Sequence, residues 1–303
     1  MLQEVDAPAP KIEQTYKARE MEGIVDLHFY RPIGFRIAQF FAKRNVAPAT
    51  VTLLGGFFGV MGGHFYFYQD LGLNLLGLFF QAVANAFDNA DGQLARLLHR
   101  ESHTGRILDG VVDHVVWASV YVHLAMRYVI TDNSWAVLIL AIFAAASHAV
   151  QAAAADFART AYLYFAKGGD HGETDASPKM PRIDNAWDKV LSRLEANFAR
   201  QQEMIAPALA RLRERIARDL GGAVPESLSS RYLDDSRPLL KWWRLLMTNT
   251  RMLMLLLLLL VGHPVWFFWL EITLFNVLLV CLLAEQKRTA EFGLEMFSSQ
   301  AAA

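Results

Sequence analysis

The chain has 303 residues, of which 54% are hydrophobic, and its formal net charge is −1. This composition lies toward the membrane end of the range for ordinary chains, and the near-zero charge gives no overall attraction to nucleic acid or anionic lipid. The single cysteine, Cys281, excludes an intrachain disulfide bond. The length fits one large domain or two small ones.

The N-terminal region is polar before the first apolar stretch begins. We expect residues 1–28 to form a polar segment without a cleavable signal peptide, because charged residues interrupt any apolar core. Residues 29–44 then place aromatic and aliphatic side chains beside basic residues such as Arg31 and Arg36. That pattern predicts an amphipathic helix that lies in the membrane interface.

Longer apolar stretches follow, and each is compared with the roughly 20 residues that a helix needs to span a bilayer. We expect six spans, namely residues 50–68, 72–90, 106–130 and 135–166, and two within 242–284 that divide at Gly262-His263-Pro264. Asn249 and Arg251 interrupt the fifth span. The predicted fold is therefore an all-α polytopic membrane protein, with a C-terminal tail over residues 289–303.

The basic residues of the connections predict which side of the membrane each connection faces. The connection around Asp70 has no Lys or Arg, whereas basic residues gather in the alternate connections at Lys43 and Arg44, Arg96 and Arg100, 167–241, and Lys287 and Arg288. Because basic residues mark the cytoplasmic side, this alternation predicts that both termini are cytoplasmic. A bacterial inner membrane is the simplest location, since the sequence carries no organelle signal.

The polar segment 167–241 separates residues 29–166, with the interfacial helix and four spans, from residues 242–288, with two. It is too long for a simple connection. Apolar residues recur at helical spacing on both sides of Pro207, and Gly221 follows the second run, as helix ends prefer. We therefore expect a cytoplasmic helical insert that caps the membrane domain or forms a dimer contact, which leaves a homodimer open.

Four aspartates stand at the inner ends of the second and third spans: Asp88, Asp91, Asp109 and Asp113. Carboxylates at this depth are costly, and they are usually paired, bound to cations or turned toward water. At about 100° per residue, the aspartates of each helix share one face, so two facing helices would bring four carboxylates together. Hard divalent cations with oxygen ligands would neutralise such a cluster.

Small residues share these faces with the aspartates, namely Gly92, Ala95 and Gly105. They leave room for a flat or phosphorylated ligand to approach the backbone. The alternative is that they only permit close helix packing, which is common in membranes. Their alternation with acids on one face favours a binding site.

This pattern resembles the diagnostic motif of the CDP-alcohol phosphotransferases, also called CDP-alcohol phosphatidyltransferases. The motif is Asp-x-x-Asp-Gly-x-x-Ala-Arg, then eight residues, then Gly-x-x-x-Asp-x-x-x-Asp, and it matches at Asp88, Asp91, Gly92, Ala95, Arg96, Gly105, Asp109 and Asp113. A Pro-x-x-x-Thr step from Pro48 to Thr52 enters the first span, although Ala49 stands where many members have Asn. The insert 167–241 departs from the compact family pattern.

The resemblance implies a transferase of substituted phosphate groups (EC 2.7.8 type) in phospholipid biosynthesis. It would move a phosphatidyl group from a membrane donor such as CDP-diacylglycerol to a hydroxyl acceptor, and it would release CMP. By resemblance, two Mg²⁺ ions, with Mn²⁺ as a substitute, would bind Asp88, Asp91, Asp109 and Asp113. Asp113 would also be the general base, and the nucleotide would contact Thr52, Gly92, Ala95, Arg96 and Gly105.

Two basic residues within the spans bear on the acceptor. Arg159 resembles the position at which some relatives bind a phosphorylated acceptor, and a buried Arg251 needs an anionic partner. One interpretation is that both bind the phosphate of glycerol phosphate or inositol phosphate. The alternatives are a structural ion pair of Arg251 with Glu271 or the aspartates, and a neutral alcohol or lipid as acceptor. A transporter with intramembrane carboxylates is the alternative from another class of protein.

Overall fold

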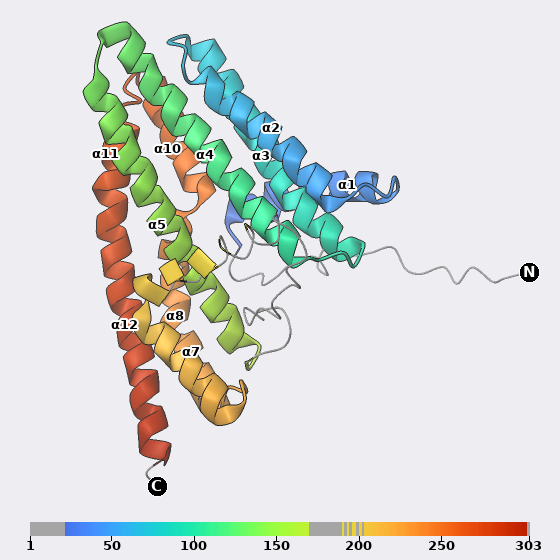
Figure 1. The fold of residues 1–303 in the computed structure, drawn as a ribbon, viewed down its shortest axis with the longest axis vertical. Helices are drawn as coiled ribbons and strands as arrows, with labels where there is room; N and C mark the ends of the chain where they lie inside the picture. The colour runs from blue at the N-terminus through green and yellow to red at the C-terminus, as the bar shows by residue number, and fades with distance from the viewer. Residues whose placement is uncertain are drawn as a thin grey trace, which may run out of the picture. The chain divides into compact units, whose positions relative to one another are not determined.

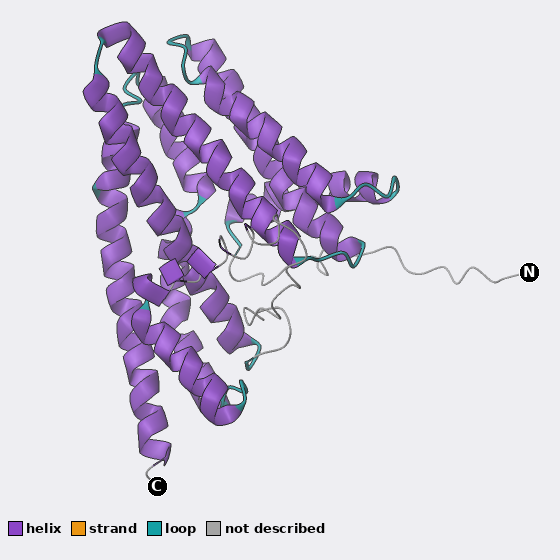
Figure 2. Cartoon of the chain, viewed as in Figure 1, coloured by secondary structure: helices purple, strands orange, loops and turns teal. Residues whose placement is uncertain are grey.

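The computed structural model describes residues 22–169 and 203–301, with isolated positions between 190 and 201. In this part of the chain every element is helical, apart from one isolated antiparallel bridge between Gly169 and Ala223 (Figures 1 and 2). The all-α prediction is therefore confirmed. The helices are α1 Arg31–Ala42, α2 Pro48–Phe65, α3 Leu71–Leu97, α4 His103–Asp132, α5 Trp135–Ala166, α7 Pro207–Leu220, α8 Glu226–Ser236, α9 Leu240–Trp243, α10 Thr248–Leu260, α11 Trp266–Ile272 and α12 Leu274–Ala301.

Among the described residues, four helical segments are long and apolar enough to cross a membrane: Leu71–Leu97, Thr104–Asp132, Trp135–Ala166 and Trp266–Met296. A bent pair, Glu226–Leu246 with Thr248–Leu260, raises the number to five if it is one span. This supports an integral membrane protein but does not confirm six spans. The first predicted span corresponds to α2, which has 18 residues and is not among these segments.

The described residues divide into two compact units. The first contains the residues up to Phe65 together with Leu76–Val120, and the second contains Tyr66–Leu75 together with the residues from Tyr121 onward. In the first unit, α2 lies beside α3 and α4 (Figure 1). A Cβ atom added to Gly56 would lie 2.6 Å from Val112 of α4, and one added to Gly59 would lie 2.5 Å from Val116. These glycines therefore let α2 and α4 approach closely, as membrane helices do at small residues.

Helix α1 occupies part of the stretch that was expected to be an interfacial helix. It follows a π-helical turn, Asp26–Tyr30, and it packs against α2 and α3 within the first unit. The buried residues of this contact are small or aliphatic: Ala38, Val51, Ala90 and Leu94. The position of α1 at a membrane surface stays a prediction.

In the second unit, α7 and α8 pack against α5 and α12 (Figure 1). Their shared core contains residues from all four helices, including Phe165, Leu212, Tyr232 and Ala290. Helix α7 is the helix expected after Pro207, and it ends at Gly221, whose φ is 60°. The helix expected before Pro207 lies largely outside the described residues. The described part of the insert therefore packs against α5 and α12 through a shared apolar core.

Candidate metal and nucleotide site

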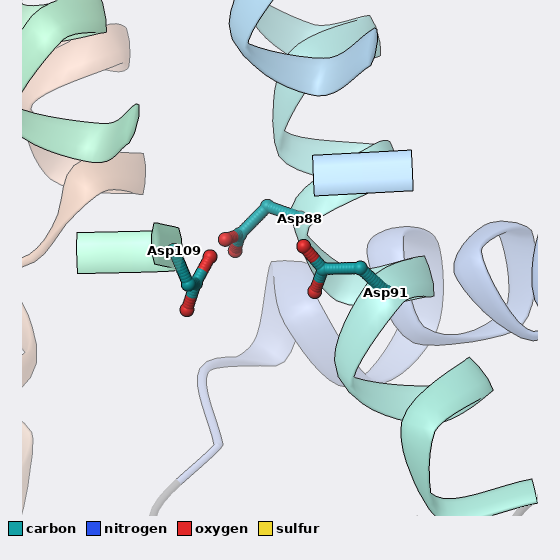
Figure 3. Close-up of side chains that lie close together, drawn as sticks. All are labelled: Asp88, Asp91 and Asp109. Carbon is teal, nitrogen blue, oxygen red and sulfur yellow. The ribbon is translucent and has the colours of Figure 1, made fainter. Parts of the chain in front are cut away.

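Three of the four motif aspartates lie together within the first unit. One carboxylate oxygen each from Asp88, Asp91 and Asp109 lies within 4.8 Å of the other two. Asp88 and Asp91 come from α3 and Asp109 comes from α4, and their carboxylates point toward one another (Figure 3). Asp91 is buried, and the other two are half-buried. Three clustered carboxylates repel one another unless a cation neutralises them, and their oxygens are the ligands that Mg²⁺ and Ca²⁺ prefer.

Thr52 holds the most buried of these carboxylates. Its hydroxyl oxygen Oγ1 lies 2.5 Å from Oδ2 of Asp91, and the hydroxyl is also 3.2 Å from the carbonyl oxygen of Pro48. The side chain of Thr52 is itself buried near the start of α2. Helix α2 thus orients Asp91 through a hydrogen bond donated by Thr52, in addition to packing against α3 and α4.

Asp113 lies one turn after Asp109 on α4, but it does not belong to the three-carboxylate group. Its side chain is exposed, and it remains within electrostatic range of Asp88 and Asp91. Asp113 is thus accessible beside the cluster.

The small residues of the motif border the aspartates and Arg96. A Cβ atom on Gly92 would lie 3.5 Å from Nη2 of Arg96, so the guanidinium lies across Gly92 at ordinary contact distance. Arg96 is also within electrostatic range of Asp91. Ala95 and Gly105 are half-buried, and a Cβ atom added to Gly105 would lie 3.0 Å from Oγ of Ser102. This side of the site is lined by short side chains and one cation.

Arg251 forms a buried ion pair in the second unit. Its Nε donates to Oε1 of Glu271 at 2.9 Å, and its Nη2 donates to Oε1 of Gln151 at 2.5 Å. A further hydrogen bond runs from Nη1 to the carbonyl oxygen of Leu246. Arg251 and Glu271 have no exposed surface. This is the ion pair with Glu271 that the sequence left open as the structural alternative, and the acceptor role of Arg251 stays a prediction.

Arg159 lies on α5 near the end of the apolar part of that helix. Its side chain is half-buried, with Nε enclosed by the protein. Arg159 belongs to the second compact unit, whereas the aspartates belong to the first.

A second row of polar side chains on α3, formed by Asn85, Asn89 and Gln93, was not predicted from the sequence. Asn85, Asn89 and Gln93 recur at intervals of four on an apolar helix, so they share a face that differs from that of the aspartates. The regular spacing of these amides would have revealed a buried polar contact. Gln151, a partner of Arg251, was also missed, since nothing in the alanine-rich sequence around it marks a contact with residues 100 positions away.

These features define a carboxylate cluster at the ends of two packed apolar helices, bordered by glycines and an arginine. Residues 45–169 match the sequence model of the CDP-alcohol phosphatidyltransferase family. This part of the chain is therefore similar in sequence to that family.

Two curated relatives match a similar length of chain. An uncharacterized protein of Aquifex aeolicus is 32% identical over 111 residues, which is 37% of this chain and 55% of that protein. A phosphatidylinositol phosphate synthase of Streptomyces avermitilis is 32% identical over 119 residues, which is 39% of this chain and 48% of that protein. The matched part thus spans about half the length of these relatives.

Proposed function

We propose that the chain is a membrane CDP-alcohol phosphotransferase of phospholipid biosynthesis. It transfers a phosphatidyl group from a CDP-linked donor such as CDP-diacylglycerol to a hydroxyl acceptor and releases CMP. The observation that carries this proposal is the carboxylate cluster of Asp88, Asp91 and Asp109, which lies inside the matched family domain. Asp113 completes the proposed set of ligands for two Mg²⁺ ions, with Mn²⁺ as a substitute.

The residues of the site divide the chemical work. Asp113 accepts the proton of the acceptor hydroxyl, and the hydroxyl oxygen forms a bond to the phosphorus distal to cytidine. The bond that breaks joins this phosphorus to the oxygen of the CMP phosphate, so CMP leaves with the electron pair. Divalent cations, when bound by the aspartates, supply charge neutralisation for the diphosphate and the leaving CMP.

The remaining motif residues form the proposed nucleotide pocket. Gly92, Ala95 and Gly105 leave space at the backbone, and Arg96 contributes a cation that suits a phosphate oxygen. Thr52 holds Asp91 in the orientation that the cluster requires, through the hydrogen bond between their side chains.

The proposed topology has six spans, with both termini and the insert 167–241 in the cytoplasm of a bacterial cell. It counts α2 as the first span and the bent segment before Leu260 as the fifth. Support comes from the alternation of basic residues along the connections. A homodimer also stays a prediction.

We propose a phosphorylated alcohol as the acceptor, held by Arg159. Similarity to the phosphatidylinositol phosphate synthase of Streptomyces avermitilis favours inositol phosphate over glycerol phosphate. A neutral alcohol or a lipid is the alternative acceptor. Arg251 is the weaker candidate for this role, because its guanidinium already contacts Glu271 and Gln151.

The test is CMP release by the purified protein with CDP-diacylglycerol and Mg²⁺ against a panel of acceptors. The panel contains inositol phosphate, glycerol 3-phosphate, free inositol and serine. We expect Asp109→Asn to abolish release, whereas Asp132→Asn, an exposed aspartate at the other end of α4, leaves it unchanged. Near-normal release by Asp109→Asn at saturating Mg²⁺ would refute the assignment of the site.

A further inference from the structure

The segment before α2 is attached to the back of the motif helix α3 by polar contacts that the transfer mechanism does not use. Tyr30 forms a side-chain hydrogen bond with Asn85. The amide Nε2 of Gln93 donates to the carbonyl oxygen of Arg31 at 3.3 Å. Two turns of α3 separate Asn85 from Gln93, and Asp88 and Asp91 lie between them in sequence.

Arg31 is itself fixed by a buried ion pair. Its Nη2 lies 2.5 Å from Oε1 of Glu22, and its Nε lies 3.3 Å from Oε2. Both residues are only 7% exposed, and Gln93 is 0% exposed. Because a buried ion pair with a two-point contact restricts both side chains, the carbonyl group of Arg31 presents a fixed acceptor to Gln93.

Between these two polar contacts the backbones of α1 and α3 touch. A Cβ atom on Gly34 would lie 3.1 Å from the backbone nitrogen of Ala90 and 3.1 Å from Cβ of Asn89. Neither atom is the end of a flexible side chain, so an added Cβ atom requires α1 and α3 to move apart locally by a few tenths of an ångström. The displaced residues stand directly between Asp88 and Asp91.

The contacts lie on the side of α3 that faces away from the carboxylates. At 100° per residue, the direction of Asn89, the middle of the Asn85–Gln93 row, differs by about 130° around the helix axis from the mean direction of Asp88 and Asp91. The segment 22–34 therefore touches no reacting atom, but it fixes the position and rotation of the helix that carries two of the three clustered aspartates.

We infer that Tyr30, Arg31 and Gly34 are positioning residues, which hold α3 in the rotation that directs Asp88 and Asp91 toward Asp109. This inference rests on the proposed function, because it assigns these aspartates to a divalent cation. Residues that hydrogen-bond to metal ligands typically change metal affinity by 10–100-fold when they are altered. Tyr30, Arg31 and Gly34 contact the helix rather than a ligand, so an effect at the lower end of that range is expected.

The experiment measures Mn²⁺ binding to the purified full chain by the electron paramagnetic resonance signal of free Mn²⁺, without substrate. We expect Gly34→Ala to weaken binding about 10-fold, at the lower end of that range. We expect Tyr30→Phe, which keeps the ring and removes the hydroxyl group, to weaken binding by a smaller factor. The milder variant keeps the inference testable if Gly34→Ala does not fold.

Matched controls separate positioning from stability. Gly62→Ala adds a Cβ atom 2.8 Å from the carbonyl oxygen of Gly77, which is also on α3 but about three turns from Asp88. Tyr66→Phe removes a buried hydroxyl group that has no hydrogen-bond partner among the described residues. We expect both controls to bind Mn²⁺ as the wild type does, even where the melting temperature falls.

Asp91→Asn distinguishes the two ways in which the result can fail. If Asp91→Asn loses Mn²⁺ binding but Gly34→Ala and Tyr30→Phe bind normally, the positioning inference is wrong and the metal site stands. The same holds if Gly62→Ala weakens binding as much as Gly34→Ala. If the wild type and Asp91→Asn bind Mn²⁺ equally, the proposed metal site is wrong, and the inference fails with it.

Discussion

The ion pair between Arg251 and Glu271 allows a quantitative test, because both side chains are completely buried. The perturbation is Glu271→Gln, which keeps the shape of the side chain and removes its charge. The guanidinium of Arg251 then remains buried with Gln151 and a backbone carbonyl as partners. It loses the carboxylate with which it forms its ion pair.

The expected cost follows from this burial. Removing one partner of a buried ion pair destabilises a protein by about 3–5 kcal/mol, because the remaining charge is uncompensated. At roughly 2–4 °C per kcal/mol for chains of 150–250 residues, the melting temperature should fall on the order of 10 °C. Replacing both partners by apolar residues, in Arg251→Met with Glu271→Leu, should recover most of the loss, since no buried charge remains.

The assay is thermal unfolding in detergent of the two single variants and the double variant. An exposed pair on α7, Arg218 with Glu214, gives the control, because removing either partner there should change stability by less than about 1 kcal/mol. An unchanged melting temperature for Glu271→Gln would refute the structural role. If Arg251→Met instead raised the KM for a phosphorylated acceptor without loss of stability, Arg251 would be an acceptor ligand.

Three further predictions concern other parts of the chain. Gly169→Ala should cost about 1–3 kcal/mol, because Gly169 has a φ of 117° and an added Cβ atom would lie 2.1 Å from the carbonyl oxygen of Gly222. Gly168→Ala should cost less in the same melting assay, because its added Cβ atom meets no atom within 4 Å among the described residues. Arg159→Ala should raise the KM for a phosphorylated acceptor by about 10- to 150-fold and leave donor binding unchanged, as steady-state kinetics would reveal; an unchanged KM would remove Arg159 from the acceptor site. Chelation by EDTA should stop CMP release, and added Mg²⁺ should restore it; release that continues in EDTA would contradict the metal requirement.

The helices could be predicted from the sequence where hydropathy and turn residues agree. The span expected at residues 135–166 is α5 with the same bounds, and the helix expected after Pro207 ends at Gly221 as expected. The expected span over 72–90 is longer in the structure, because α3 continues to Leu97 through the polar motif residues. A span predicted from hydropathy ends where polar residues begin. The helix itself continues, because its backbone hydrogen bonds do not depend on the polarity of the side chains.

The break expected at Gly262-His263-Pro264 is present, because α10 ends at Leu260 and α11 begins at Trp266, but the break at Met247 could not be predicted in the same way. At Met247 the backbone is extended between Leu246 and α10, and the guanidinium of Arg251 bonds the carbonyl oxygen of Leu246 at this break. The side chains that contact Arg251 belong to Gln151 and Glu271, which lie 100 and 20 residues away in the sequence. No local sequence pattern therefore predicts these contacts. The sequence did suggest Glu271 as one alternative, because a buried cation requires an anion.

The candidate site was predictable at the level of residue types and spacing. The spacing of the motif predicted that Asp88, Asp91 and Asp109 lie on facing sides of two helices. The exposed position of Asp113, outside the three-carboxylate group, depends on the rotation of α4 and could not be predicted. The hydrogen bond from Thr52 to Asp91 depends on the close approach of α2 to α3. Periodicity describes each helix alone, and these contacts depend on how two helices are rotated against each other.

The most direct test of the proposed transfer follows the phosphorus that is distal to cytidine. CDP-diacylglycerol labelled with ³²P at this phosphorus would be incubated with the purified protein, Mg²⁺ and inositol phosphate or glycerol 3-phosphate. The account predicts that the label appears in a new phospholipid and that the released CMP is unlabelled, and that Asp91→Asn forms neither product. Two results would contradict the account. In the first, the label stays in intact CDP-diacylglycerol, which only binds or moves across the membrane. In the second, the label leaves as inorganic phosphate.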